Sequence, residues 1–154
     1  MHPSRGEGET PWRCLHPKDA AGGPVADLLD LEPLPVTALN NSELEMLYKF
    51  SHFNPIQTQL FHCLYHTDNN VLLGAPTGSG KTVAAEIATF RIFREAPEAK
   101  VVYIAPLKAL VRERVEDWRV RLQEKLGKRV VELTGDVSPR HKSHPGMLYT
   151  LHKL

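Results

Sequence analysis

Nine consecutive residues in the middle of the chain have the types and order of a phosphate-binding loop. Gly78 and Gly80 permit backbone angles that other residues avoid, so successive amide N–H groups can turn toward one anion. Lys81 is placed to reach the β- and γ-phosphates of a nucleoside triphosphate, and the Thr82 hydroxyl to hold Mg²⁺. The sequence therefore predicts a nucleotide site made of Gly74, Ala75, Pro76, Thr77, Gly78, Ser79, Gly80, Lys81 and Thr82.

The segments on either side of this loop support the prediction. The apolar run Val71–Gly74 predicts a strand, and the apolar period from Lys81 to Arg94 predicts a helix. A strand, a glycine loop and a helix form the context in which such a loop binds phosphate. The strict motif has glycine where this chain has Ala75. A glycine-rich turn that binds nothing is the alternative, and the intact Gly80–Thr82 ending disfavours it.

Hydrophobic spacing predicts that helices and strands alternate along the chain, which implies βαβ crossovers and a parallel sheet. We therefore expect an α/β fold. In the helix that begins at Asn54–Pro55 we expect Ile56, Leu60, Cys63 and Leu64 to form the buried stripe. The other expected elements are a helix from a Ser42–Glu45 capping box, strand Val101–Ala105, helix Lys108–Leu126 ended by Gly127, and strand Arg129–Leu133.

Composition divides the 154 residues into three parts. Residues 1–40 are rich in proline, glycine and charge and are interpreted as linker or disorder, with Leu34–Val36 extended along a neighbour. Residues 41–139 carry the α/β pattern. Residues 140–154 lack a clean period, so an irregular tail is predicted there. The length fits one domain with one core.

Charge and cysteine content exclude few classes of function. The formal net charge of +1 does not indicate nucleic acid, membrane or an acidic substrate. Cys14 and Cys63 are too few for a disulfide framework, which suits a reducing compartment. No apolar run approaches membrane-spanning length, and Met1–Thr10 lacks the apolar core of a signal peptide. We expect a soluble intracellular protein, nuclear or cytoplasmic, without a membrane partner.

Three further segments are placed to complete a site around the loop. Phe53–Gln59 precedes the loop, while Ala105–Leu110 and Leu133–Asp136 follow predicted strands, where parallel sheets bind ligands. Eight basic and four acidic residues between Lys108 and Arg129 leave a local charge of +4. A solvated helix face with ion pairs explains this charge as well as a nucleic-acid contact does. A core stripe is predicted for the same helix at Val111, Val115, Trp118 and Leu122.

These motifs, in this order, resemble the superfamily 2 helicases of the DExH type, in particular their double-cassette branch. The resemblance covers about Leu28 to Pro139, and alanine is usual in that family at the position of Ala75. It implies part of a RecA-like P-loop domain that uses ATP and Mg²⁺. It also implies that the partners are the backbone of single-stranded DNA or RNA and subunits of a helicase complex.

The resemblance also implies roles for individual residues. Gln57 corresponds to a glutamine that reads adenine, with Phe53 packing near the base. Exposed N–H groups at a helix start and a lysine bind phosphate without reading sequence. The implied contacts to the nucleic-acid backbone are Pro106, Leu107, Lys108, Thr134 and Gly135.

Other parts of such a helicase are not found in this sequence. The family has a later Asp-Glu pair, a second RecA-like domain, and another strand beyond Val137–Pro139, where this sequence departs from its pattern. We therefore expect the ATP- and nucleic-acid-binding front segment of a helicase, which alone does not turn over ATP. A non-catalytic module that competes with the full helicase, and a small P-loop kinase, are the alternatives.

Overall fold

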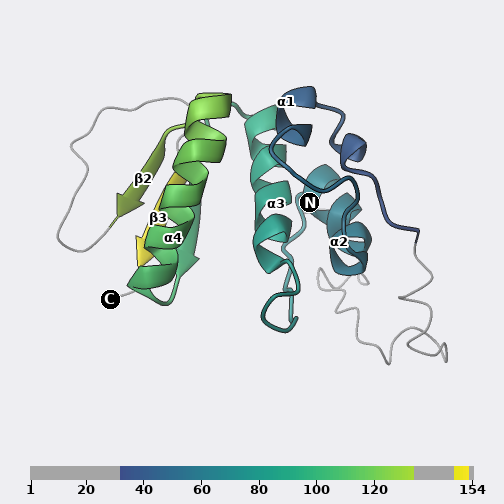
Figure 1. Cartoon of the computed structure of the whole chain (residues 1–154), viewed down its shortest axis with the longest axis horizontal. Helices are drawn as coiled ribbons and strands as arrows, with labels where there is room; N and C mark the ends of the chain where they lie inside the picture. Colours follow the sequence, from purple (N-terminus) through teal and green to yellow (C-terminus); the bar gives the residue numbers. More distant parts are fainter. Residues whose placement is uncertain (1–31, 134–147, 153–154) are drawn as a thin grey trace, which may run out of the picture.

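The computed structural model of the chain describes residues 32–133 and 148–152, in which α4 lies on a small parallel sheet and α1, α2 and α3 lie to one side of it (Figure 1). Within these residues, no helix combines the length and apolar character needed to cross a membrane. The elements are the 3₁₀ helix η2 (Val36–Leu39), α1 (Ser42–Glu45), α2 (Pro55–His66), α3 (Lys81–Glu95), β1 (Val101–Ala105), α4 (Lys108–Trp118), the π-helical segment η3 (Arg119–Glu124), β2 (Val130–Leu133) and β3 (Leu148–His152).

The sheet has three parallel strands in the order β1-β3-β2, which confirms the expected α/β class with a parallel sheet. Leu148 at the start of β3 lies opposite Val101 of β1 on one side and Val130 of β2 on the other. The prediction of an irregular tail over residues 140–154 is therefore wrong for residues 148–152. A strand with neighbours on both sides pairs its backbone groups twice, and that tertiary pairing outweighs weak local preference.

The segment Val71–Gly74 is not a strand, contrary to the prediction. A strand requires a hydrogen-bonded neighbour, and in residues 32–133 and 148–152 no strand pairs with this segment. Leu72 is accordingly 86% exposed. The segment is apolar, but among the described residues it has no paired strand. The phosphate loop therefore follows a connection without regular secondary structure.

Helix α4 packs on the sheet through the stripe that its sequence predicts. Val111, Val115, Trp118 and Leu122 are all buried, and the Trp118 ring meets the Tyr103 ring of β1 edge-on at 4.9 Å between centroids. The last turns are π-helical over η3, a variation that hydrophobic spacing does not reveal. Gly127 ends the helical segment with a φ of 66°, as expected for a glycine after a helix.

The buried face of α2 differs from the predicted stripe. Gln57, Phe61 and Tyr65 are buried, whereas the predicted stripe (Ile56, Leu60, Cys63, Leu64) is only partly buried. The two aromatic rings bury more area than the aliphatic side chains, and the buried Gln57 amide accepts one hydrogen bond and donates one within the protein. The aliphatic residues alone therefore predict a buried face of α2 that differs from the observed one.

Residues 32–40 are ordered parts of the fold, so the linker prediction is wrong for that portion of 1–40. Leu34–Val36 does lie on a neighbour, because Pro35 forms an antiparallel bridge with His52. Val36 and Leu39 are buried in the core. Helix α1 begins at Ser42, where the sequence predicts a helix start, but its cap is Asn41 and not Ser42, since the Asn41 side chain accepts hydrogen bonds from the Glu43 and Leu44 N–H groups.

Candidate nucleotide-binding site

The phosphate loop has the backbone form that its glycines predict. Gly78 has a φ of 82° and Gly80 a φ of 87°, both in the left-handed region. Gly80 is also the N-cap of α3, and no side chain caps this helix. The first N–H groups of α3 therefore have no partner from a capping side chain and are available to an anion at the positive end of the helix dipole.

Lys81 lies at the first position of α3 and reaches back over the loop. Its Nζ donates hydrogen bonds to the carbonyl oxygens of Ala75 and Pro76, each at 2.6 Å. The ammonium group is thus held at the loop and can exchange these carbonyls for phosphate oxygens. The Ser79 hydroxyl is buried and has no hydrogen-bond partner among the residues that the structure describes, so a group bound in the loop could satisfy it.

The side chains of Asn54 and Gln57, at the start of α2, form hydrogen bonds to backbone carbonyls of the phosphate loop. We call these two residues the loop clamp. Asn54 Nδ2 donates to the Ser79 carbonyl at 3.0 Å, and Gln57 Nε2 donates to the Gly80 carbonyl at 3.3 Å. The two clamp residues also form a capping box with each other, because Gln57 Oε1 accepts from Asn54 N–H and Asn54 Oδ1 accepts from Gln57 N–H.

The loop clamp places the predicted adenine-reading residue against the phosphate loop. The predicted start of α2 at Asn54–Pro55 is confirmed. Spacing could not reveal the contacts to the loop, because Gln57 and Gly80 are 23 residues apart. The sequence identifies the Asn54 side chain only as a helix cap and does not reveal its hydrogen bond to the Ser79 carbonyl of the loop.

Replacing Gly80 with alanine is expected to disrupt nucleotide binding. A Cβ at Gly80 would lie 2.2 Å from Gln57 Nε2 and 2.8 Å from Asn54 Nδ2, and the positive φ would add strain of about 1–3 kcal/mol. We expect a loss of at least about tenfold in ATP affinity, measured by competition with a fluorescent analogue. Gly127→Ala is the control, since Gly127 lies outside the site, has a φ of 66° and has nothing within 4 Å of an added Cβ. Equal affinities of the two variants would contradict this account of the clamp.

Phe53, which directly precedes the loop clamp in the sequence, is a core residue. Its ring is 1% exposed and stands 5.4 Å from Phe61 and 5.9 Å from both Tyr48 and Phe50, between centroids. A ring enclosed in this way supports the start of α2 and does not offer an open face to a base. Phe50, which is partly exposed, is the neighbouring ring nearer to solvent.

The predicted nucleic-acid contacts are only partly covered by the structure. Pro106, Leu107 and Lys108 form the exposed turn between β1 and α4, and no side chain caps α4. In the part of the chain that the structure describes, no hydrogen bond joins this turn to the phosphate loop. Thr134 and Gly135 lie outside the described residues.

Two arginines of the basic helical segment take part in ion pairs within the protein. Arg121 forms a bidentate pair with the buried Glu86, and Arg114 pairs with Glu113 and Asp117 on its own helix. The Arg114 pairs agree with the alternative of a helix face with ion pairs, whereas the main partner of Arg121 is a buried carboxylate on another helix. Lys108 is not part of these ion pairs and lies at the exposed start of α4.

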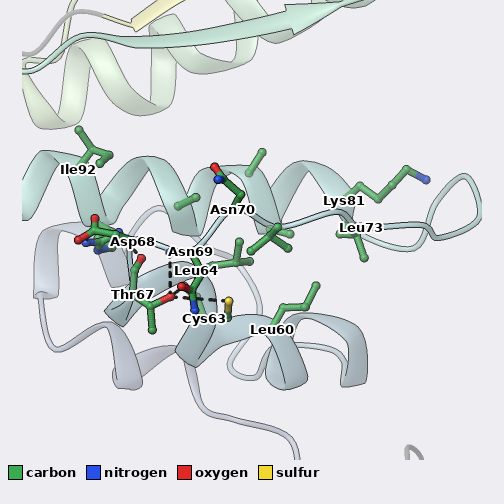
Figure 2. A pocket seen from close by; sticks show the side chains of 15 residues that line it. Leu60, Cys63, Leu64, Thr67, Asp68, Asn69, Asn70, Leu73, Lys81 and Ile92 are labelled. Atoms are coloured by element: carbon green, nitrogen blue, oxygen red, sulfur yellow. Dashed lines mark hydrogen bonds and ion pairs between the residues drawn. The ribbon is translucent and has the colours of Figure 1, made fainter. Parts of the chain in front are cut away.

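A separate cavity of about 550 Å³ lies between α2, α3 and the connection before the loop. Figure 2 shows Leu60, Cys63 and Leu64 on one wall and Ile92 on α3 opposite, with Asp68 toward one end. The Lys81 side chain extends from the other end along the loop. Because its lining is mainly apolar, this cavity does not have the chemistry of a triphosphate site.

Comparison with known proteins agrees with the geometry of the loop. The family model described as "DEAD/DEAH box helicase" matches residues 54–148, which include the loop clamp, the phosphate loop, the β1–α4 turn and the first residue of β3. The chain belongs to the DEAD/DEAH box helicase family. The match continues past Pro139, so the expected departure from the helicase pattern at that residue is not supported.

Relatives from animals and a plant place this helicase segment in a DExH-type group, as the sequence resemblance predicted. The chain is 76% identical over 116 residues to activating signal cointegrator 1 complex subunit 3 of Gallus gallus, covering 75% of this chain and 5% of that protein. The human protein of that name is 71% identical over 120 residues, covering 78% and 5%. The DExH-box ATP-dependent RNA helicase DExH14 of Arabidopsis thaliana is 71% identical over 96 residues, covering 62% and 4%.

Proposed function

We propose that this chain supplies the ATP-binding face and one nucleic-acid contact of an ATP-dependent superfamily 2 helicase. The observation that carries the proposal is the phosphate loop, held by Asn54 and Gln57, with Lys81 at the uncapped start of α3. The chain spans about 5% of the length of the cointegrator subunits it matches. Unwinding and assembly are therefore properties proposed for the whole helicase.

ATP fits the polar groups that the site presents. The loop offers N–H groups at a helix start, the Lys81 ammonium and the unpartnered Ser79 hydroxyl to the phosphates. Gln57 uses one amide hydrogen and one carbonyl lone pair within the protein. A second hydrogen and a second lone pair remain, and this donor and acceptor complement adenine. This supports the role of Gln57 as the adenine reader.

Magnesium would be held by the Thr82 hydroxyl together with the nucleotide phosphates. Thr82 follows Lys81 in the first turn of α3 and is partly buried beside the loop. A bound Mg²⁺ would neutralise phosphate charge. Lys81 and the loop N–H groups would orient the same phosphates, so this chain contributes positioning and charge.

The β1–α4 turn is the proposed contact to nucleic acid. Leu107 is exposed, α4 has no side-chain cap, and Lys108 adds a positive charge at its start. Such a turn binds backbone phosphate and does not distinguish bases. The name of the plant relative specifies an RNA helicase, which favours RNA as the strand, and the cointegrator relatives are named as complex subunits. We propose that the whole helicase acts within such a complex, in the nucleus or the cytoplasm.

Reversing the charge of Lys108 tests the proposed contact. Lys108→Glu should weaken binding of single-stranded RNA and DNA alike, because it removes a phosphate contact and adds repulsion. The slope of log affinity against log salt should fall by about one. Fluorescence anisotropy over a salt series measures both quantities.

Lys49→Glu makes the same change in net charge at another exposed lysine, outside the β1–α4 turn. If Lys49→Glu weakens binding as much as Lys108→Glu, the contact is a general effect of charge and the proposed turn is wrong. A sequence-specific preference in the unmodified chain would also contradict a backbone contact.

A further inference from the structure

One buried carboxylate makes the polar contacts between the helix after the phosphate loop and the helix after the β1–α4 turn. Glu86 of α3 is 1% exposed, and its Oε1 accepts hydrogen bonds from Trp118 Nε1 and Arg121 Nη1, each at 2.8 Å. Its Oε2 accepts from Arg121 Nη2 at 3.1 Å. In residues 32–133 and 148–152, these are the only hydrogen bonds and ion pairs that join α3 to residues 108–124. We call Glu86, Trp118 and Arg121 the helix joint.

The guanidinium group of Arg121 has several contacts besides Glu86. It donates to Asp117 Oδ2 at 2.9 Å and, through Nε, to the Leu47 carbonyl at 3.4 Å. The guanidinium carbon lies 5.5 Å from the centre of the Tyr48 ring. Burial, together with the charge of Glu86, raises the pKa of Tyr48.

Packing alone does not require this ion pair. The stripe of Val111, Val115, Trp118 and Leu122 already buries the inner face of α4. A buried ion pair adds little net stability compared with apolar side chains of the same volume, because desolvation opposes the attraction. A bidentate arginine–carboxylate pair does fix one distance and one angle between two helices. The helix joint therefore sets orientation more than stability.

The direction of the chain connects the helix joint to both proposed binding sites. Short connections on either side of β1 reverse the chain twice, so α3 and α4 run the same way, and Figure 1 shows them side by side. Glu86 is about 7 Å along α3 from Lys81, and Arg121 is about 20 Å along the helical segment from Lys108. A shift of α3 on nucleotide binding would therefore act on the C-terminal end of this helical segment. The proposed nucleic-acid contact, Lys108, lies at the opposite end.

We propose that the helix joint couples the two sites, with Glu86 and Arg121 as positioning residues that transmit nucleotide binding to the β1–α4 turn. This inference rests on the proposed function of the two sites. It is distinct from any coupling through a second domain, since all of its residues lie in this segment. Coupling of this kind is reciprocal, so each ligand changes the affinity for the other by the same factor.

The test measures the affinity of the 154-residue chain for a labelled single-stranded RNA, with and without a saturating non-hydrolysable ATP analogue and Mg²⁺. The ratio of the two dissociation constants is the coupling factor, and we expect at least about fivefold in the unmodified chain. Arg121→Lys keeps the charge and loses the bidentate geometry. The factor should fall to about one, while each ligand measured alone binds within about threefold of the unmodified chain.

Arg114→Lys is the matched control, because it makes the same change on the same helix at ion pairs that stay within α4. Its coupling factor should not change. Trp118→Phe provides a second test: it removes the Nε1 donor to Glu86 and keeps a smaller aromatic ring in the buried stripe, and it should also lower the factor. An unchanged factor in both Arg121→Lys and Trp118→Phe overturns the inference, as does an equal loss in Arg114→Lys.

Binding measurements on the unmodified chain distinguish a failure of this inference from a failure of the proposed function. If it binds both ligands with a coupling factor of about one, the helix joint has no coupling role and the proposed function stands. If it binds neither the ATP analogue nor RNA at low salt, the proposed function fails and the inference fails with it.

Discussion

Replacing Lys81 with alanine is expected to lower the affinity for Mg-ATP by roughly 100-fold. The side chain supplies the ammonium charge nearest to the loop, and one hydrogen bond to a charged group contributes about 1.5–3 kcal/mol, where each 1.4 kcal/mol is a factor of ten. The fold should be unaffected, because the side chain is exposed and, within residues 32–133 and 148–152, bonds only to the Ala75 and Pro76 carbonyls. Titration with a fluorescent ATP analogue, together with circular dichroism, measures both effects.

The Lys81 result needs a control for general loss of positive charge. Lys49→Ala removes an exposed lysine outside the site and should leave ATP affinity unchanged. If Lys81→Ala binds ATP as tightly as Lys49→Ala, the ammonium group makes no phosphate contact and the loop is not the nucleotide site.

Changing Gln57 to glutamate is expected to weaken ATP binding by at least about tenfold. Glutamate can still accept the hydrogen bond from Asn54 N–H, but it cannot donate to the Gly80 carbonyl as Gln57 Nε2 does. A buried carboxylate would face that carbonyl and the bound phosphates, which adds repulsion. The preference for ATP over GTP should also fall, and competition titrations with both nucleotides measure it.

Gln59→Glu is the matched control for this substitution. Gln59 lies on the same helix, two residues further along, and is exposed. The two variants have the same net charge. A difference between their ATP affinities is therefore caused by the location of Gln57 beside the loop and not by the added charge. Equal ATP affinities, or no preference for ATP in the unmodified chain, would contradict the adenine-reading role.

The local parts of the site could be predicted from the sequence because local rules determine them. The left-handed backbone at Gly78 and Gly80 follows from the glycines themselves, and Asn54–Pro55 is a recognisable helix start. The stripe of α4 also follows from spacing, since its apolar residues recur at three and four positions. The family resemblance extended these observations to a helicase, which the family match confirms.

The contacts that organise the site could not be predicted, because each joins residues far apart in the sequence. Glu86 and Arg121 are separated by 35 positions, and before folding each is an ordinary charged residue on a helix. The pairing of β3 between β1 and β2 is likewise non-local, so the weak pattern of residues 148–152 gave no sign of a central strand. Val71–Gly74 shows the converse, since a strong apolar run forms no strand without a paired neighbour.

The most direct test of the central claim is the amide NMR spectrum of the ¹⁵N-labelled chain during titration with Mg-ATP. We predict saturable shifts of the backbone amides from Gly78 to Thr82 and of the Gln57 side-chain amide, because these groups face the nucleotide or hold the loop. Shifts confined to residues outside the phosphate loop that line the cavity between α2 and α3, such as Leu60, Leu64 and Ile92, would contradict the claim that this phosphate loop binds ATP, as would no shifts at all.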